Sequence, residues 1–269
     1  MLCLLQEGLS LDDTYQSYVN RVARLTLPET HRNQLLNLQP SPKYHQGRPV
    51  PFPGYSIVTP PGPADPLNPA LYEQLVPVQQ NLQEIFGPAF CALPPDSFHL
   101  TLADLIWDGA YQDAIAENPQ FVTDLKQRIQ QSFQGYQPVW SESGFIQWQL
   151  LGLLVFPRAL AVALAPKGEG DYPPIVELRR SLYQNQGLMS LGVEQQYHFT
   201  AHISLGYFDQ VPALVAEETV LDKLSQVNDQ WLVNDPQFFK IQQVELRYFS
   251  DMTCFTRETS DPVLQLTQD

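Results

Sequence analysis

Two five-residue segments of this chain repeat one pattern: apolar, histidine, apolar, hydroxyl, apolar. They are FHLTL at 98–102 and AHISL at 201–205. Because successive side chains of a β-strand point to opposite faces, His99 and Thr101 share one face of the first segment. His202 and Ser204 share one face of the second in the same way. The repetition predicts two half-buried strands, each presenting an imidazole with a hydroxyl about 6–7 Å further along.

A single His-x-Thr tetrad carries little information, because it occurs often by chance. Either histidine alone is more often a structural residue on a half-buried strand. Two copies, each in a segment whose sequence is typical of a strand, are a much more specific sign of a functional pair. If both histidines were structural after all, the prediction of the two strands would stand unchanged.

The surrounding sequence extends the repeat. After residue 54 the apolar periodicity predicts strand, helix, strand, helix, strand twice over. The first set is 55–58, 71–86, 98–105, 121–135 and 145–151; the second is 160–164, 175–188, 199–208, 211–232 and 238–249, with a further strand at 252–257. Pro77 should kink or divide the helix at 71–86. We therefore expect an α+β fold, a bilobal pseudo-two-fold duplication of a β-α-β-α-β unit around a central cleft.

The expected organisation has three parts. Residues 1–53 form an N-terminal helix and a Pro-rich extended arm. Residues 54–258 form the two-lobed domain, with lobes at about 54–152 and 153–258, and residues 259–269 form a C-terminal tail. The pattern does not assign a role to the N-terminal part.

Composition limits the partners. The net charge of −14 opposes binding to long nucleic acid, whose affinity depends on Lys and Arg at phosphates. A small phosphodiester or an oligonucleotide end remains compatible, since one pocket can be positive in an acidic protein. The apolar stretch 150–165 is interrupted by Pro157-Arg158 and is too short to span a bilayer, so no membrane is expected. The first residues lack the basic n-region of a signal peptide. The three cysteines form no CxxC pair, so neither a disulfide framework nor a zinc site is indicated. Both features favour a cytoplasmic protein, and the sequence does not give its oligomeric state.

The doubled tetrads, His99-Leu100-Thr101-Leu102 and His202-Ile203-Ser204-Leu205, resemble the signature of the two-histidine phosphoesterases. This superfamily holds the 2′-5′ RNA ligase-like proteins and the 2′,3′-cyclic phosphodiesterases. The resemblance covers residues 54–258 and suits an uncharacterised subgroup with a longer N-terminal region. It implies a central cleft with one motif strand on each side, and it implies no metal and no cofactor.

The implied chemistry also follows from the residues. Cleaving a phosphodiester needs a base for the attacking water or hydroxyl and an acid for the leaving oxygen. Histidine can do either near neutral pH. His99 and His202 would form this pair, and Thr101 and Ser204 would donate hydrogen bonds to the phosphate oxygens. Pseudo-symmetry leaves open which histidine is the base. The expected activity is hydrolysis of 2′,3′-cyclic phosphates or 2′-5′-linked nucleotide or RNA ends.

Five further residues are candidates for substrate contact. His198 and Thr200 have the parity of His202 on the expected strand 199–208, and Tyr207 and Trp107 flank the motif strands. Arg158, between two apolar strands, could offset phosphate charge. Each has a plainer interpretation: a surface histidine at the strand start, core or rim aromatics, and a solvated arginine.

Three other functions stay open. The first is a binder of nucleotides or RNA ends that has the same cleft but no turnover. The second is an interaction module whose residues 1–53 cover the cleft, so that deletion would uncover activity. The third, a metallohydrolase using His198 and His202, would be sensitive to EDTA, but about 13 Å between these residues is too far for one metal ion.

Overall fold

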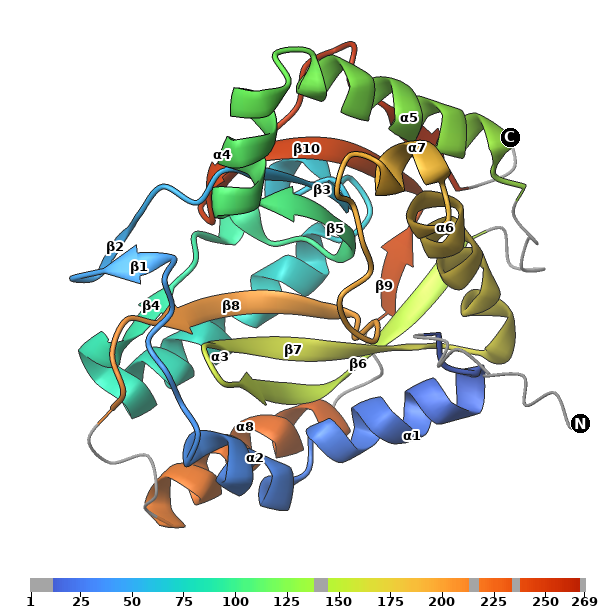
Figure 1. Cartoon of the computed structure of the whole chain (residues 1–269). Coiled ribbons are helices and arrows are strands. Elements are labelled where there is room, and N and C mark those ends of the chain that lie inside the picture. The colour runs from blue at the N-terminus through green and yellow to red at the C-terminus, as the bar shows by residue number, and fades with distance from the viewer. Residues whose placement is uncertain (1–11, 138–144, 213–217, 234–237, 267–269) are drawn as a thin grey trace, which may run out of the picture.

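The structure is a computed structural model that describes residues 12–137, 145–212, 218–233 and 238–266. Two five-stranded antiparallel sheets face each other, with helices on their outer sides (Figure 1). The first sheet has the order β11-β10-β3-β5, with β12 paired to β10. The second has the order β4-β8-β7-β6-β9. The α+β class expected from the sequence is confirmed.

The strands of the first sheet come from both ends of the chain. They are β3 (Gly54–Val58), β5 (Thr101–Trp107), β10 (Gln243–Asp251), β11 (Cys254–Thr256) and β12 (Val263–Gln265). Those of the second are β4 (Phe90–Ala92), β6 (Ile146–Phe156), β7 (Ala159–Pro166), β8 (His202–Phe208) and β9 (Phe238–Ile241). Every residue of the central strand β7 is buried, as its unbroken apolar sequence requires.

The two halves of the chain exchange strands. β6 comes from the first half but pairs with β7 of the second, and β10 comes from the second half but pairs with β3 of the first. The lobes expected at 54–152 and 153–258 are therefore wrong as spatial units. The strand expected at 238–249 is likewise two strands, β9 and β10, which lie in different sheets. A hydrophobic pattern predicts a strand but does not determine the strand with which it pairs.

The helices follow the apolar periodicity with some differences. They are α3 (Pro69–Phe86), α4 (Asp108–Glu117), α5 (Phe121–Gly135), α6 (Pro173–Tyr183), α7 (Gln186–Met189) and α8 (Glu218–Val233), with 3₁₀ turns η1 (Gly62–Ala64), η2 (Gly87–Ala89), η3 (Pro95–Ser97) and η4 (Glu169–Asp171). Pro77 does not divide α3. The helix expected at 175–188 is two helices, α6 and α7, and α4 was not expected. Of the helix expected at 211–232, residues 213–217 lie outside the described residues.

The N-terminal part belongs to the domain. It contains α1 (Tyr15–Leu25), α2 (Pro28–Leu35) and a small hairpin of β1 (Tyr44–His45) and β2 (Arg48–Pro49). Thr14 caps α1 by accepting a hydrogen bond from the Ser17 amide. Tyr18 and Val22 are fully buried, because α1 packs along β7 on the outer face of the second sheet (Figure 1).

Two other expectations meet the structure here. Residues 259–269 are not simply a tail, since β12 pairs with β10 and Leu266 is fully buried. Among the described residues, no helix combines the length and the apolar character that a membrane crossing requires.

Candidate active site

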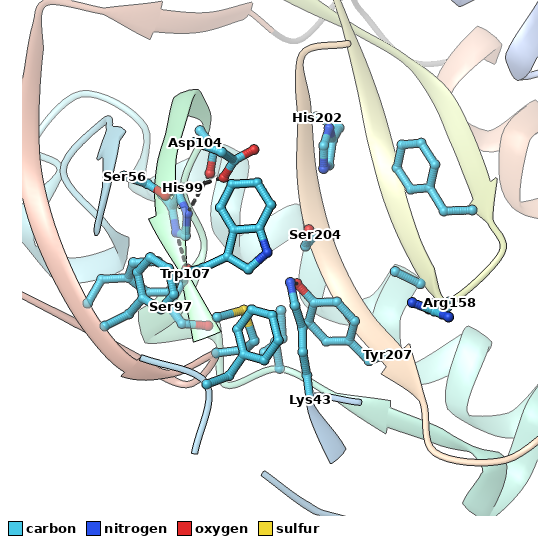
Figure 2. A pocket seen from close by; sticks show the side chains of 18 of the residues that line it. Lys43, Ser56, Ser97, His99, Asp104, Trp107, Arg158, His202, Ser204 and Tyr207 are labelled. Atoms are coloured by element: carbon cyan, nitrogen blue, oxygen red, sulfur yellow. Dashed lines mark hydrogen bonds between the residues drawn. The ribbon is translucent and has the colours of Figure 1, made fainter. Parts of the chain in front are cut away.

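The histidine-bearing segments line one cleft of about 740 Å³ between the two sheets. Seven of the residues singled out in the sequence line it: His99, Thr101, Trp107, Arg158, His202, Ser204 and Tyr207. The two imidazoles lie on opposite walls, with Ser204 and Tyr207 following His202 along β8 (Figure 2). The structure thus brings both His-hydroxyl pairs to one space.

His99 lies just before β5, where the chain is tied to the neighbouring loop. The Leu100 amide donates to the Thr59 hydroxyl at 3.0 Å, and the Thr59 amide donates back to the Leu100 carbonyl at 3.0 Å. Phe98 and Leu100 point into the core. The His99 ring packs on Phe255 of β11, with 4.2 Å between ring centroids. The apolar residues of the motif therefore fix the wall from which the imidazole projects.

His202 opens β8 and is held from behind by α1. The Tyr18 hydroxyl accepts from the Ala201 amide at 3.0 Å and donates to the Leu164 carbonyl at 2.9 Å. The His202 ring packs edge-on against Phe156, with 5.0 Å between centroids. Each imidazole is thus flanked by a phenylalanine from a different strand.

Both histidines have the same fixed tautomer when neutral. Nδ1 of His99 lies 2.7 Å from the Ser97 carbonyl oxygen, and Nδ1 of His202 lies 2.7 Å from that of Thr200. A carbonyl only accepts, so Nδ1 carries the proton and Nε2 has a lone pair that can accept one. In His99 this nitrogen lies 3.1 Å from the Thr101 hydroxyl. Nε2 is therefore the atom of each ring available for proton transfer.

Burial lowers the pKa of both imidazoles. For His99 the pKa falls to about 4, mainly through desolvation, with His202 and Arg247 lowering it further. For His202 desolvation is again the largest cause, and Lys43 adds to it. The Ser97 and Thr200 carbonyls and the Asp104 carboxylate act in the opposite direction. Burial therefore favours the neutral form of both rings in the free protein.

A β-bulge follows each motif and changes which side chains face the cleft. In β5, Val58 pairs with Thr101 and Ile57 with Ala103, so Leu102 is the extra residue. In β8, Ala161 pairs with Ser204 and Leu160 with Gly206, which makes Leu205 the extra residue. Strict alternation would place Asp104 and Tyr207 on the opposite faces from Thr101 and Ser204. The bulges bring both into the cleft.

Asp104 is a cleft residue that sequence reasoning missed, because the bulge at Leu102 changes the alternation. Its carboxylate accepts hydrogen bonds from the Ser56 hydroxyl at 3.3 Å and from the Tyr197 hydroxyl. The Tyr183 hydroxyl donates to its backbone carbonyl at 2.9 Å. A fixed negative charge therefore lies on the His99 wall.

Other lining residues were also missed. Lys43 and Phe52 come from the Pro-rich arm, and Phe156 and Phe255 lie beside the two imidazoles. The arm residues gave no signal because their contacts are distant in the sequence. Phe156 ends β6 and Phe255 lies within β11, and the sequence of a strand does not distinguish a cleft wall from a core.

His198 and Thr200 were expected to face the cleft, and the structure places them elsewhere. β8 begins at His202, so the alternation expected for 199–208 does not extend to them. His198 is exposed and lies 3.9 Å from the Asp13 carboxylate. The Thr200 hydroxyl accepts from Arg21 of α1 at 2.8 Å, and its carbonyl orients His202. Thr200 therefore positions the imidazole through its backbone.

His31, which lies outside the motifs, is a structural residue. His31 is buried, and its Nε2 lies 3.0 Å from the Leu153 carbonyl oxygen. In the part of the chain that the structure describes, no three His, Cys, Asp or Glu side chains are grouped as metal ligands would be.

Comparisons with known proteins identify the fold. No protein-family model matches the chain. No curated protein matches it either. Among solved structures, a conserved protein of unknown function from Agrobacterium tumefaciens is 15% identical with a TM-score of 0.56, covering 85% of this chain and 93% of that one.

Two further structures have lower TM-scores. E. coli LigT complexed with 3′-AMP is 18% identical with a TM-score of 0.46, covering 81% of this chain and 99% of that one. Kluyveromyces marxianus Usb1 is 14% identical with a TM-score of 0.35, covering 80% and 98%. At identities this low, such a likeness is one of fold alone. The chain shares its fold with the Agrobacterium tumefaciens protein, whose TM-score is 0.56.

Proposed function

We propose that the protein is a phosphodiesterase in which His99 and His202 act as a paired acid and base. The observation that carries this proposal is the shared arrangement of the two imidazoles. Each has Nδ1 fixed by a backbone carbonyl two residues earlier, and both line one cleft. A histidine with a purely structural role does not need to present its second ring nitrogen to a cavity. An acid–base pair needs one such nitrogen on each side of the phosphorus.

The reaction proposed is hydrolysis of a 2′,3′-cyclic phosphate or of a 2′-5′-linked nucleotide end. One neutral imidazole takes a proton from water as the water oxygen bonds to phosphorus. The bond from phosphorus to the leaving sugar oxygen breaks, and the other imidazole, entering as imidazolium, protonates that oxygen. Thr101 and Ser204 donate to the non-bridging oxygens as their charge increases. The two histidines supply both proton transfers, so the mechanism requires no metal.

Trp107 and Tyr207 provide flat surfaces for the rest of the ligand. Both line the cleft and are partly exposed. An aromatic ring stacks on a base without requiring a particular sequence. A small or terminal ligand suits a cleft of this volume, and the net charge of −14 disfavours long RNA.

The test is turnover of nucleoside 2′,3′-cyclic phosphates and 2′-5′ dinucleotides with EDTA present. We expect His99→Ala and His202→Ala each to lower kcat/KM by on the order of 10²–10⁴. His198→Ala is the matched control, since His198 is exposed and outside the cleft. Full activity in both cleft variants, on a substrate the wild type cleaves, would refute the mechanism.

A binding protein without turnover is the second candidate, and the burial of the two imidazoles favours it. Burial lowers the pKa of both rings and so disfavours the imidazolium that the reaction needs. The same assay separates the two functions, since saturable binding without product over pH 5 to 8 would favour the binding protein.

A further inference from the structure

The Pro-rich arm spans one end of the cleft and is joined to both sheets. The Gln39 amide donates to the Pro157 carbonyl at 2.7 Å, and the Ser41 amide donates to the Phe208 carbonyl at 2.7 Å. Further along, the Phe52 amide donates to the Ser250 carbonyl of β10 at 2.8 Å. Lys43 lies between these attachments and is therefore held at the cleft.

Lys43 points its ammonium group into this end of the cleft. Nζ lies 3.3 Å from the Tyr207 hydroxyl, and 4.7 Å and 5.0 Å from the ring centroids of Tyr207 and Phe52. Within the described ranges, no carboxylate lies within ion-pair distance of it. The two rings hold the side chain in place and leave its charge uncompensated.

Arg158 adds a second cation beside Tyr207. It lies in the turn between β6 and β7, next to Ala159, which pairs with Tyr207. Its Nη2 donates to the Gln39 side chain of the arm at 3.1 Å. Among the residues the structure describes, it too makes no ion pair. The remaining guanidinium N–H groups are free to bind an anion.

The cleft therefore has positive side chains at one end and a carboxylate toward the other. Figure 2 shows Lys43 and Arg158 near Tyr207, and Asp104 on the far side of His99. In a chain with 29 acidic and 15 basic residues, two unpaired cations at one end of a cleft favour an anionic group there. That end lies beyond Ser204, which the proposed function places at the reacting phosphate.

We propose that Lys43 and Arg158 bind a second phosphate of the substrate. This inference rests on the proposed function for the position of the first phosphate. Ser204 and Tyr207 lie on one strand about 8–10 Å apart. The long side chains of Lys43 and Arg158 can extend from the region of Tyr207 toward Ser204 over part of that distance. The substrate class is thus a nucleotide end with phosphates on both sides of one ribose, either a 5′-phosphate or the preceding phosphodiester.

The test compares equilibrium binding of adenosine 3′,5′-bisphosphate with that of adenosine 3′-monophosphate. We expect the wild type to prefer the bisphosphate by about tenfold or more, as charge-assisted hydrogen bonds allow. Lys43→Met keeps the apolar stem and removes the charge, and with Arg158→Gln it should reduce this ratio to nearly one. Lys43→Arg should retain the preference. Lys223→Met, on the exposed face of α8, is the control for the loss of one positive charge away from the cleft.

The outcomes separate this inference from the proposed function. A wild type without preference, or a double variant that keeps it, would overturn the second-phosphate site even if cyclic phosphates are hydrolysed. A preference that disappears in the double variant supports the site even if no substrate turns over. A 3′-phosphorylated dinucleotide with a free 5′-hydroxyl tests the preceding phosphodiester as the source of the second anion.

Discussion

The guanidinium of Arg179 donates a hydrogen bond to the carbonyl oxygen of Leu102, the extra residue of the bulge in β5. The corresponding carbonyl in β8, that of Leu205, accepts from the Gln79 side chain at 2.7 Å. Gln79 lies on α3, from the first half of the chain, and Arg179 on α6, from the second. Each half therefore supports the motif strand of the other through a buried side chain.

Arg179 and Gln79 are accordingly positioning residues. Arg179 is 3% exposed and packs over Phe199, with 4.4 Å from the guanidinium carbon to the ring centroid. We expect Arg179→Met to lower the free energy of unfolding by about 1–3 kcal/mol, because a buried carbonyl loses its donor. If the bulge relaxes, Asp104 turns from the cleft and its raising effect on the His99 pKa is lost. A lower His99 pKa in an NMR titration would reveal this change.

The neighbouring residue Arg180 provides the control for this prediction. Arg180→Met removes an equal charge from α6, but Arg180 forms its ion pairs with Asp12 and Glu177 away from the bulge. An unchanged His99 pKa in a folded Arg179→Met protein would show that Arg179 only stabilises the fold.

The two histidines can be assigned their roles with an activated substrate. A 4-nitrophenolate leaving group needs little protonation, so the variant that lacks the acid should regain much of its activity on bis(4-nitrophenyl) phosphate. The variant that lacks the base should not. We expect His99→Ala and His202→Ala to differ by about tenfold or more in this recovery, measured as relative kcat/KM. Equal recovery in both would contradict a division into one acid and one base.

Anion binding should take up a proton. Burial lowers the pKa of both imidazoles in the free protein, which favours their neutral forms. An anion between the rings stabilises the imidazolium and raises these pKa values. Sulfate, which keeps its charge throughout, should therefore bind more tightly as pH falls from 8 to 5, by up to about tenfold per unit. Calorimetry in buffers of different ionisation enthalpy measures the protons directly.

Two results bear on this pH prediction. His99→Gln combined with His202→Gln should abolish proton uptake, because the titrating groups are gone. Equal sulfate affinity at pH 5.5 and pH 8 in the wild type would contradict it.

The sequence predicted the motif strands and the α+β class because these depend on local alternation and on one repeat. The exchange of β6 and β10 between the sheets could not be predicted, since both strands have apolar patterns that suit either partner. The bulge at Leu102 in β5 carries no glycine or proline that would mark an irregular strand. In β8, Gly206 directly follows Leu205 and is such a mark, but the sequence prediction did not use it.

The errors at the site have the same origin. Asp104 was missed and His198 was wrongly expected because strict alternation was applied beyond the residues that form a regular strand. The alternation of side chains held for Thr101 and Ser204, because each lies two residues after its histidine and before the bulge. Lys43 was missed because only the folded arm brings it to Tyr207, far away in the sequence.

Substitution of Tyr18 tests whether the N-terminal part covers the cleft or supports the site. Its fully buried hydroxyl bridges the Ala201 amide and the Leu164 carbonyl immediately before His202. Tyr18→Phe leaves a buried amide without its partner, so we expect the free energy of unfolding to fall by about 1–3 kcal/mol in urea titrations. Tyr15→Phe, on the same helix, should change it by under about 0.5 kcal/mol. Deletion of residues 1–53 should then abolish folding; a stable truncated protein with increased activity would instead identify this segment as a cover.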